Sequence, residues 1–450
     1  MAKKKQIELS IEEKLQNALV PKEEQPYKIP SNWCWLYSNF VVDVRDGTHD
    51  TPKYISEGYP LITSKNLKNN NIDFDKVNYI SKEDYEKINL RSKVDIGDVL
   101  FSMIGTIGNP VLIKGQTNYA IKNVALFKDI NLINMTFFRF YLETKFVIDK
   151  MKKEAKGSTQ KFVSLKYLRN FPICYPSLEE QQRIVNRIEF LFAKLDRAKE
   201  LIENTLAQFE QNKMAILHKA FTGELTAKWR KENNIDLSSW EKIKLGKVLL
   251  PMQTKKPTGQ FFRYIDIDAI DNKRQIVKAP KLILTEKAPS RASRGVETGN
   301  ILFSMVRPYL KNIAQIDSDL SDCIASTGFY VCRCKPELNS RFLYYLFIFD
   351  KTIDYLMQFM KGDNSPSIRK DDLLNMKIDL PTIEEQQEIV NILDNLLAKY
   401  NKIKNLEQQL EKIELLKKAI LAKAFRGELG TNNPDEESAE NLLKEILAEK

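Results

Sequence analysis

One long segment of this sequence occurs twice, and the repetition limits the possible folds more than any other feature. Residues 177–225 begin SLEEQQRIV and end KAFTGEL, whereas residues 382–429 begin TIEEQQEIV and end KAFRGEL. Glu179 returns as Glu384 and Phe221 as Phe425, so the copies differ in length by a single residue. So close a match over so long a segment is not chance, and we interpret the chain as a tandem duplication.

Both copies have the pattern of a long amphipathic helix. Ser177 and Thr382 each follow a proline and precede a glutamate by three positions, which predicts a capping box. Gly223 and Gly427 follow the last apolar residues and are expected to end the helices in the left-handed conformation. The apolar residues between them recur every three or four positions, a narrow stripe that favours helix pairing. We therefore expect two rods of roughly 65 Å that pack antiparallel.

Basic charge is concentrated outside the repeats. Residues 177–229 and residues 382–430 each hold 8 basic and 8 acidic side chains. Residues 27–176 hold 22 basic against 15 acidic, and residues 230–381 hold 25 against 18. Two basic blocks separated by neutral helices indicate two contacts with one polyanion. A general lysine bias is the plainer alternative.

The duplication divides the chain into six predicted segments. They are an N-terminal helical segment (1–26), a mixed block (27–176), the central repeat (177–229), a second mixed block (230–381), the C-terminal repeat (382–430) and an acidic helical tail (431–450). GDVLFSM at 97–103 returns as GNILFSM at 299–305, so the blocks share a framework and differ in their loops. The predicted fold class is α+β, with two mixed α/β domains alternating with two long helices that pair as an antiparallel coiled coil in a pseudo-twofold arrangement.

The composition sets the expected compartment. No apolar run approaches membrane-spanning length, and the basic start MAKKKQIELS lacks the apolar region of a secretory signal. Five cysteines, an odd and small number, fit a reducing compartment. We expect a cytoplasmic protein.

Signals for catalysis and metal binding are weak. His49 and His218 are the only histidines and fall in different modules, and Ala422 replaces His218 in the second copy. Cys332 and Cys334 have no second pair nearby, so zinc is not expected. The chain has neither a glycine-rich phosphate loop nor the Asn-Pro-Pro-aromatic element of adenine methyltransferases. We expect no catalytic residue, no metal and no cofactor in this chain.

Side chains that can contact bases or phosphates occur in loops of both blocks. The candidates in the first block are Thr48, His49, Lys53, Tyr54, Ser64, Lys65 and Asn66. Those in the second are Lys255, Lys256, Gln260, Arg263, Tyr264, Arg291, Ser293, Arg294, Arg307 and Tyr309. Each of them taken alone is more often a solvated surface group.

The shared ends of the repeats form the second candidate site. Because they are nearly identical, they are expected to dock two copies of one partner. The residues are Glu179, Glu180, Gln181, Gln182, Phe221 and Glu224 in the first copy, and Glu384, Glu385, Gln386, Gln387, Phe425 and Glu428 in the second.

Two variable basic blocks that alternate with EEQQ…KAFxGEL repeats resemble the specificity subunit of a type I restriction–modification system. DGTHDTP at 46–52 with GDVL at 97–100 resembles one class of its target-recognition domains. The resemblance covers essentially the whole chain. It implies that each block reads one half of a bipartite, asymmetric site in double-stranded DNA, while the paired helices set the spacing of the halves.

The same resemblance implies the partners. Two methyltransferase subunits would bind the helices and modify adenine at N6 with S-adenosylmethionine. Restriction subunits, which use ATP and Mg²⁺ for translocation and cleavage, would complete the complex. These cofactors belong to the partners, because this chain lacks their motifs. A coiled-coil adaptor that joins two proteins without reading DNA is the main alternative, and a self-sufficient nuclease is a more distant one.

Overall fold

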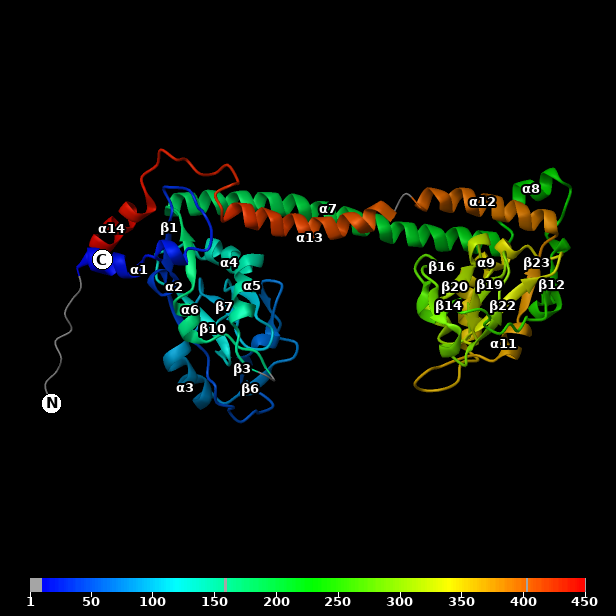
Figure 1. Cartoon of the computed structure of the whole chain (residues 1–450), viewed down its shortest axis with the longest axis horizontal. Helices are drawn as coiled ribbons and strands as arrows, with labels where there is room; N and C mark the ends of the chain where they lie inside the picture. The colour runs from blue at the N-terminus through cyan, green and yellow to red at the C-terminus, as the bar shows by residue number, and fades with distance from the viewer. Residues whose placement is uncertain (1–9, 158–159, 402–403, 450) are drawn as a thin grey trace. The chain divides into compact units, whose positions relative to one another are not determined.

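The computed structural model describes residues 10–157, 160–401 and 404–449, which belong to two compact units (Figure 1). One unit combines the chain up to Leu201 with the chain from Gln408 onward, and the other contains the residues from Ile202 to Glu407. Both boundaries fall inside the helical repeats. Each unit therefore consists of one mixed α/β module and one half of each repeat.

The first repeat forms one continuous helix, α7 (Leu178–Phe221), of 44 residues, as predicted. The second forms α12 (Ile383–Asn401) and α13 (Lys404–Ala424), and the continuous helix predicted there crosses residues 402–403, which lie outside the described residues. Gly223 and Gly427 follow the repeats with φ of +79° and +74°. This confirms the left-handed helix ends.

The predicted capping boxes are only half correct. Ser177 Oγ accepts a hydrogen bond from the Glu180 amide at 3.2 Å, and Thr382 Oγ1 accepts one from the Glu385 amide at 3.4 Å. Neither glutamate carboxylate returns to the backbone of its cap. Each carboxylate instead accepts a hydrogen bond from the hydroxyl of the threonine that follows the other repeat, Thr431 or Thr226. Each also pairs with a guanidinium, Arg183 for Glu180 and Arg230 for Glu385.

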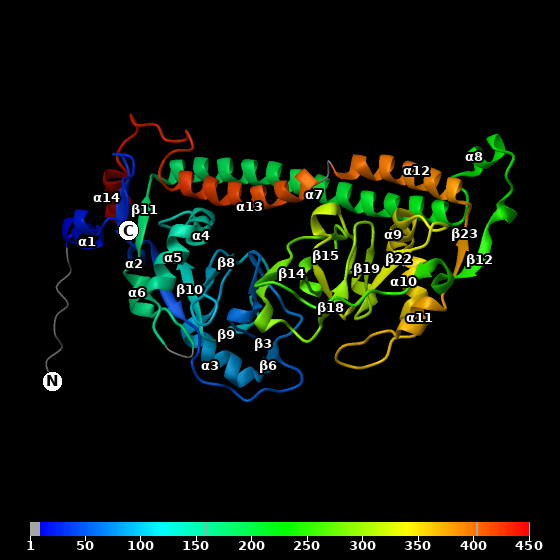
Figure 2. The ribbon, with the colours of Figure 1, turned by 45° about the vertical axis from the view of Figure 1, so that its right-hand side comes forward.

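Within the first unit, the beginning of α7 lies antiparallel to α13 (Figures 1 and 2). Asp196 Oδ1 lies 2.5 Å from Lys417 Nζ, and Lys199 Nζ lies 3.2 Å from Glu414 Oε1. A step forward along α7, from Asp196 to Lys199, is thus a step backward along α13, from Lys417 to Glu414, so the two helices are antiparallel. Exposed pairs such as these contribute little to stability, whereas Ile184 and Ile188 of α7 share a buried hydrophobic core with Leu421 of α13.

The second unit has its own pair of helical segments. Leu217 and Ala220 of α7 share one buried core with Ile389 and Leu393 of α12. Both helices also contact the module of their unit through this core, which includes Phe342. The half-repeats are thus part of each unit's hydrophobic core.

Both modules contain the same four-stranded antiparallel sheet. Its order in the first module is β2 (Val42–Asp46), β10 (Val124–Asp129), β7 (Val99–Ser102) and β8 (Gly108–Leu112). Its order in the second is β13 (Leu249–Leu250), β22 (Phe329–Cys334), β19 (Ile301–Ser304) and β20 (Ile313–Gln315). The shared plan of the two blocks agrees with the duplication.

A smaller sheet distinguishes the modules. In the first module it consists of β6 (Asn78–Ile80), β3 (Tyr59–Ile62) and β9 (Ala120–Ile121); in the second it consists of β17 (Lys281–Leu284), β14 (Phe261–Ile265), β21 (Ile324–Ser326) and β18 (Ala292–Gly295). The strands β3 and β9 are parallel, as are β14 and β21. The first module places helix α3 (Lys82–Ser92) where the second adds strand β18.

A pair of helices connects each large sheet to its repeat. They are α4 (Met135–Glu143) and α5 (Lys145–Glu154) in the first module, and α9 (Ser340–Ile348) and α10 (Asp350–Met357) in the second. In the first module the two helices are not continuous. Thr144 separates the two helices, since its hydroxyl caps the second by accepting a hydrogen bond from the Val147 amide at 3.3 Å.

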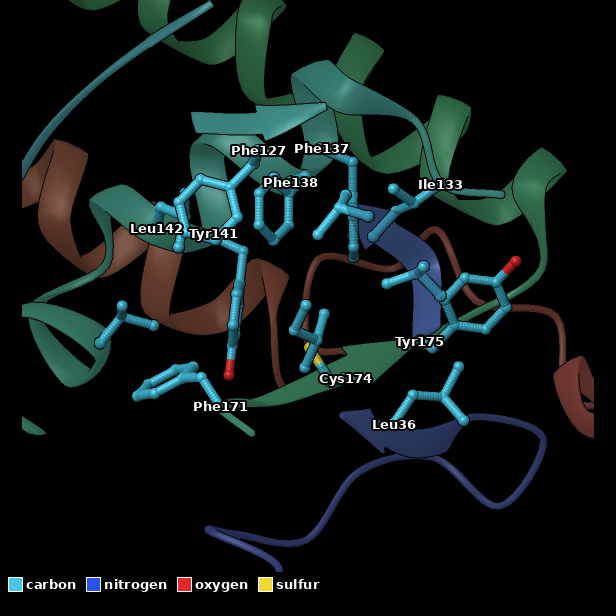
Figure 3. Packing of buried hydrophobic residues seen from close by; sticks show 14 of the residues in the cluster. Leu36, Phe127, Ile133, Phe137, Phe138, Tyr141, Leu142, Phe171, Cys174 and Tyr175 are labelled. Carbon is cyan, nitrogen blue, oxygen red and sulfur yellow. The ribbon is translucent and has the colours of Figure 1, made fainter. Parts of the chain in front are cut away.

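The core beneath α4 joins the first module to the repeats. Figure 3 shows Phe137, Phe138 and Tyr141 of α4 extending toward the strand that carries Cys174. The ring of Phe425, at the end of α13, lies 5.0 Å from the ring of Phe137 and 5.2 Å from that of Tyr141, measured between centroids. The end of the second repeat is therefore buried against the first module.

Both chain ends belong to the first unit. Helix α1 (Ile11–Ala18) contributes Leu15, and helix α14 (Ala439–Glu449) contributes Ala439 and Leu443, to the same core. These contacts give both terminal helices a place in the fold, which the sequence left open. None of the helices in the described ranges is long and apolar enough to cross a membrane.

Short elements complete the structure. Two-stranded sheets lie where the modules meet the repeats: β1 (Cys34–Tyr37) with β11 (Pro172–Tyr175), and β12 (Glu241–Lys244) with β23 (Lys377–Leu380). The remaining elements are α2 (Ser38–Val41), β4 (Leu67–Lys68), β5 (Asn71–Ile72), α6 (Leu165–Arg169), α8 (Ala227–Glu232), β15 (Ile270–Asp271), β16 (Ile276–Val277) and α11 (Lys370–Leu374).

Candidate nucleic-acid interface

Three candidate residues of the first module, Thr48, His49 and Ser64, meet at the turn between β9 and β10. Asn123 occupies this turn with φ of +55°. Its Oδ1 lies 2.9 Å from Nδ1 of His49, its amide donates to the Thr48 carbonyl at 3.1 Å, and its carbonyl accepts from Ser64 Oγ at 3.3 Å. Sequence reasoning missed Asn123. An asparagine directly before a buried strand is a signal for left-handed backbone and could have identified it.

The loop that carries Thr48 and His49 is held rigidly. Asp46 is buried and accepts hydrogen bonds from Nε2 of His49, at 2.9 Å, and from Arg91 of α3. Gly47 and Thr48 donate through their amides to Val124 and Ile121 carbonyls at 2.9 and 3.0 Å. The exposed ring of His49 is thus fixed in position before any ligand binds, which lowers the entropy cost of a contact.

Substituting Gly47 tests the importance of this rigid loop. A Cβ atom at residue 47 would lie 2.3 Å from the Ile121 carbonyl oxygen, so Gly47→Ala is expected to push the loop away from β9 and destabilise the first unit by about 1–3 kcal/mol. Urea unfolding measures this loss. Gly115→Ala is the matched control, because a Cβ there meets no atom within 4 Å. Equal stability of the two variants would contradict the role assigned to Gly47.

The second module gathers its candidates at the equivalent turn, between β21 and β22. Thr327 donates through its amide to the Arg291 carbonyl at 2.8 Å, and the neighbouring Gly328 carbonyl accepts from the Met305 amide at 2.9 Å. The Lys255 amide donates to Ser293 of β18 at 3.1 Å. One turn therefore connects the strand of Ser293 and Arg294 with the β19–β20 turn that carries Arg307 and Tyr309. Thr327 is a second residue that sequence reasoning missed.

Three arginines at this place have no acidic partner among the described residues: Arg291, Arg294 and Arg307. Arg294 is partly buried, and its Nε is enclosed without a hydrogen-bond acceptor. Burial raises the pKa of Tyr330 to about 12, and the positive charge of Arg294 acts in the opposite direction. An enclosed, unpaired cation is unfavourable in the free protein, so this arrangement favours an external anion such as a DNA phosphate.

Three of the predicted contact residues use their side chains inside the module. Asn66 is buried, with Nδ2 donating to the Asp73 carbonyl at 3.0 Å. Nη1 of Arg263 lies 2.9 Å from Asp322 Oδ1. Tyr264 belongs to a hydrophobic cluster on the small sheet. The exposed candidates Lys53, Tyr54, Lys65, Lys256 and Gln260 stay predictions.

The glutamates of the repeats form internal contacts. Glu385 accepts hydrogen bonds from Thr226 Oγ1 at 2.6 Å and Trp240 Nε1 at 2.9 Å, and it forms an ion pair with Arg230. Thr226 directly follows the first repeat. In the first unit Glu180 likewise accepts from Thr431, directly after the second repeat, at 2.7 Å. The end of each repeat thus binds the beginning of the other.

The surroundings of the two glutamates differ in charge. Glu180 pairs with Arg183 at 2.8 Å, and Arg183 also contacts Glu436. Burial raises the pKa of Glu180, although the hydrogen bonds from Thr431 and Arg183 act to lower it. In both units a hydrogen bond between a threonine and a glutamate joins the two repeats. Only Glu385 also pairs with a buried arginine, Arg230.

The glutamines of the repeats attach each repeat to its module. Gln181 Oε1 accepts from the Asn134 amide at 2.8 Å, and Gln386 Oε1 accepts from the Asn339 amide at 2.8 Å. Their Nε2 atoms donate to the Pro176 and Pro381 carbonyls, both at 2.9 Å. Both glutamines are fully buried.

Five of the side chains predicted for partner docking are instead buried within the chain: Glu180, Gln181, Glu385, Gln386 and Phe425. Phe221 is half-buried and stacks on Phe349, with ring centroids 5.3 Å apart. The others are exposed and stay predictions: Glu179, Gln182, Glu224, Glu384, Gln387 and Glu428. In the part of the chain that the structure describes, no group of three or more His, Cys, Asp or Glu residues could hold a metal ion.

Known proteins are similar to this chain in sequence and in fold. The family model "Type I restriction modification DNA specificity domain" matches residues 47–210 and again residues 240–415. The type I restriction enzyme EcoDI specificity subunit of Escherichia coli is 27% identical over 67% of this chain and 74% of its own length. The StySPI specificity subunit of Salmonella potsdam is 24% identical over 94% of this chain and 96% of its own length.

Two solved structures have a similar fold. A chain from a structure of a type I R-M system superposes with a TM-score of 0.67 at 20% identity, covering 90% of this chain and 100% of that one. The HsdS subunit from Thermoanaerobacter tengcongensis superposes with a TM-score of 0.51 at 20% identity, covering 90% and 99%. At this level of identity the likeness concerns the fold alone.

Proposed function

Since this chain belongs to the family of type I restriction–modification DNA specificity subunits, we propose that its two modules bind the two halves of one bipartite DNA site. One observation carries the proposal. On the same sheet framework, the equivalent turn of each module, at Asn123 in one and at Thr327 in the other, contacts the segments that carry predicted contact residues. The residues at the two turns differ, as two different half-sites require.

The adaptor alternative is not favoured, because both matched regions correspond to a DNA specificity domain. The unpaired arginines near Thr327 also support contact with a polyanion. We propose that the repeats dock two methyltransferase subunits through their exposed residues, such as Glu179 and Glu384, and that restriction subunits bind the resulting complex. S-adenosylmethionine, ATP and Mg²⁺ would be bound by those partners, in the cytoplasm.

Mapping of N6-methyladenine in the host genome, with and without this gene, tests the proposal. A bipartite, asymmetric motif should lose its methylation when the gene is deleted and regain it on complementation. The map would supply both half-sites and the spacer. Unchanged methylation of every bipartite motif would contradict the proposed function.

Reversing the charge of Arg291, Arg294 and Arg307 to glutamate separates DNA recognition from the adaptor alternative. Because each lost phosphate contact reduces both affinity and salt dependence, the triple variant is expected to bind its duplex at least about a hundredfold more weakly at moderate salt, with a flatter salt dependence. Fluorescence anisotropy with labelled duplex measures both quantities.

The matched control reverses Lys242, Lys244 and Lys377, which are exposed on the strands β12 and β23 of the same unit. The control should bind DNA within a few fold of the wild type. An adaptor that does not read DNA would retain full function in both triple variants.

A further inference from the structure

An open pocket of about 530 Å³ lies in the second module, between the β19–β20 turn and the residues around β15. Its polar lining includes Asp268, Asn272, Arg307 and Asn312, and its apolar lining includes Ile270 and Leu310. The whole pocket lies within one unit. Arg307 lines this pocket and is also one of the three arginines without an acidic partner, so the pocket adjoins the candidate DNA-binding turn.

The wall formed by the β19–β20 turn has no equivalent of the same length in the first module. Residues 305–312 connect β19 to β20, whereas the five residues 103–107 connect β7 to β8. The additional residues contain the short helical turn Pro308–Leu310. On a shared framework, the pocket is therefore a feature that distinguishes one module from the other.

This wall is fixed before any ligand arrives. The Arg307 amide donates to the Pro366 carbonyl at 2.8 Å, and its Nη2 donates to the Asn364 carbonyl at 2.9 Å. Asn272 Nδ2 donates to the Leu310 carbonyl at 3.0 Å, which joins the opposite wall. Arg307 and Lys311 are held in the left-handed conformation, with φ of +48° and +49°. Backbone strain of this kind persists only where the surrounding contacts enforce it.

Asn312, Asp268 and Arg307 keep polar atoms available to a ligand in the pocket. Asn312 is 6% exposed, yet its side-chain amide makes no hydrogen bond within the described ranges. Asp268 and Arg307 also form no ion pair with any described residue. Asn312 lines the open pocket, and neither of its amide atoms is enclosed. Both amide atoms are therefore available to a ligand that enters the pocket.

The mixture of charges identifies the class of ligand. A phosphate would be attracted by Arg307 but repelled by Asp268, so a purely anionic ligand does not match the lining. A nucleobase edge presents donors and acceptors side by side. An asparagine amide also offers one of each, and the base that it matches in a bidentate contact is adenine. The apolar residues Ile270 and Leu310 suit the flat face of such a ring.

We propose that this pocket receives the edge of one nucleobase, an adenine, of the half-site bound by the second module, and that Asn312 determines the specificity at that position. This inference rests on the proposed function and adds to it the residue and the base. Arg307 holds the neighbouring phosphate or base edge, while Asn312 discriminates. Loss of the Asn312 amide should therefore relax or change one position of one half-site.

The test compares Asn312→Asp with Asn234→Asp. Aspartate keeps the size of asparagine but replaces its donor with an acceptor, so the adenine contact is lost. Asn234 is an exposed residue of the same unit, and its variant controls for the added charge. Each variant of the full chain replaces the wild-type gene in the host, and the methylated motif is mapped. Purified protein is then titrated with the wild-type duplex and with duplexes changed at single positions.

For Asn312→Asp we expect the preference for adenine at one position of one half-site to fall on the order of tenfold to a hundredfold. The other half-site and the spacer should stay as they are, and Asn234→Asp should behave as the wild type. Asn312→Ser, which is small and uncharged, should show the same relaxed position if the aspartate variant does not fold.

Two results overturn the inference. If both Asn312 variants keep the wild-type motif, the pocket does not read a base. If they weaken binding to all sequences equally, the pocket contacts the backbone. In either case the proposed function stands as long as methylation of a bipartite motif still requires this gene. Failure of the proposed function is a different result, in which no bipartite motif depends on the gene at all.

Discussion

Glu385→Ala is expected to destabilise the second unit by about 3–5 kcal/mol, because it leaves the guanidinium of Arg230 buried without its partner. The Glu385 side chain is 0% exposed and that of Arg230 is 8% exposed. The substitution also removes the acceptor of Thr226 and of the Trp240 indole. Equilibrium unfolding in urea measures the loss, and Trp240 fluorescence reports on the same contact.

The duplication offers a matched comparison in Glu180→Ala. Its partner Arg183 is 36% exposed and keeps a second contact with Glu436, so water and Glu436 can take the place of the lost carboxylate. We expect this variant to lose less than half as much stability as Glu385→Ala. Equal losses would show that burial of the arginine does not decide the effect. Glu385→Gln retains a hydrogen-bond acceptor, so its loss of stability should lie between those of Glu180→Ala and Glu385→Ala.

Inserting four residues, about one helical turn, into both repeats is expected to abolish methylation of the original motif and create a new one. The insertions would follow Leu201 in α7 and precede Gln408 in α13, at the boundaries of the two units. Four residues add about 6 Å of helix. One base pair spans about 3.4 Å, so the spacer should lengthen by one to two base pairs while both half-sites stay unchanged.

Genome-wide mapping of methyladenine distinguishes the possible outcomes of this insertion. A changed spacer with constant half-sites supports the repeats as the element that sets distance. A changed half-site would mean that the repeats take part in reading bases, which contradicts the proposal. A variant that replaces four exposed residues of α7 without changing its length serves as the control and should keep the original motif.

The sequence predicted the helices well, because their signals are local. Ser177 and Thr382 cap their helices, and Gly223 and Gly427 end them in the expected conformation. The partner of each glutamate could not be predicted in this way. Glu385 is bound by Thr226, which precedes it by more than 150 positions and meets it only in the folded unit.

The candidate DNA-binding residues show the same limit. Lys65 and Asn66 are neighbours of suitable chemistry, yet Lys65 is exposed and Asn66 is buried in a network of backbone contacts. Residue type indicates what a side chain can bind, whereas the surrounding fold decides whether it is free to do so. Asn123 was missed for the opposite reason, since its role depends on a turn whose position between two strands appears only in the structure.

The joint between module and repeat has a genetic consequence. Gln181 binds the Asn134 amide and Gln386 binds the Asn339 amide at the same distance of 2.8 Å. Because the two joints are chemically the same, a gene segment that encodes a foreign module with this asparagine could recombine at either copy of the repeat and still fold onto it. New DNA specificities can then arise by exchange of whole modules between related genes, without mutation of the residues that hold the protein together.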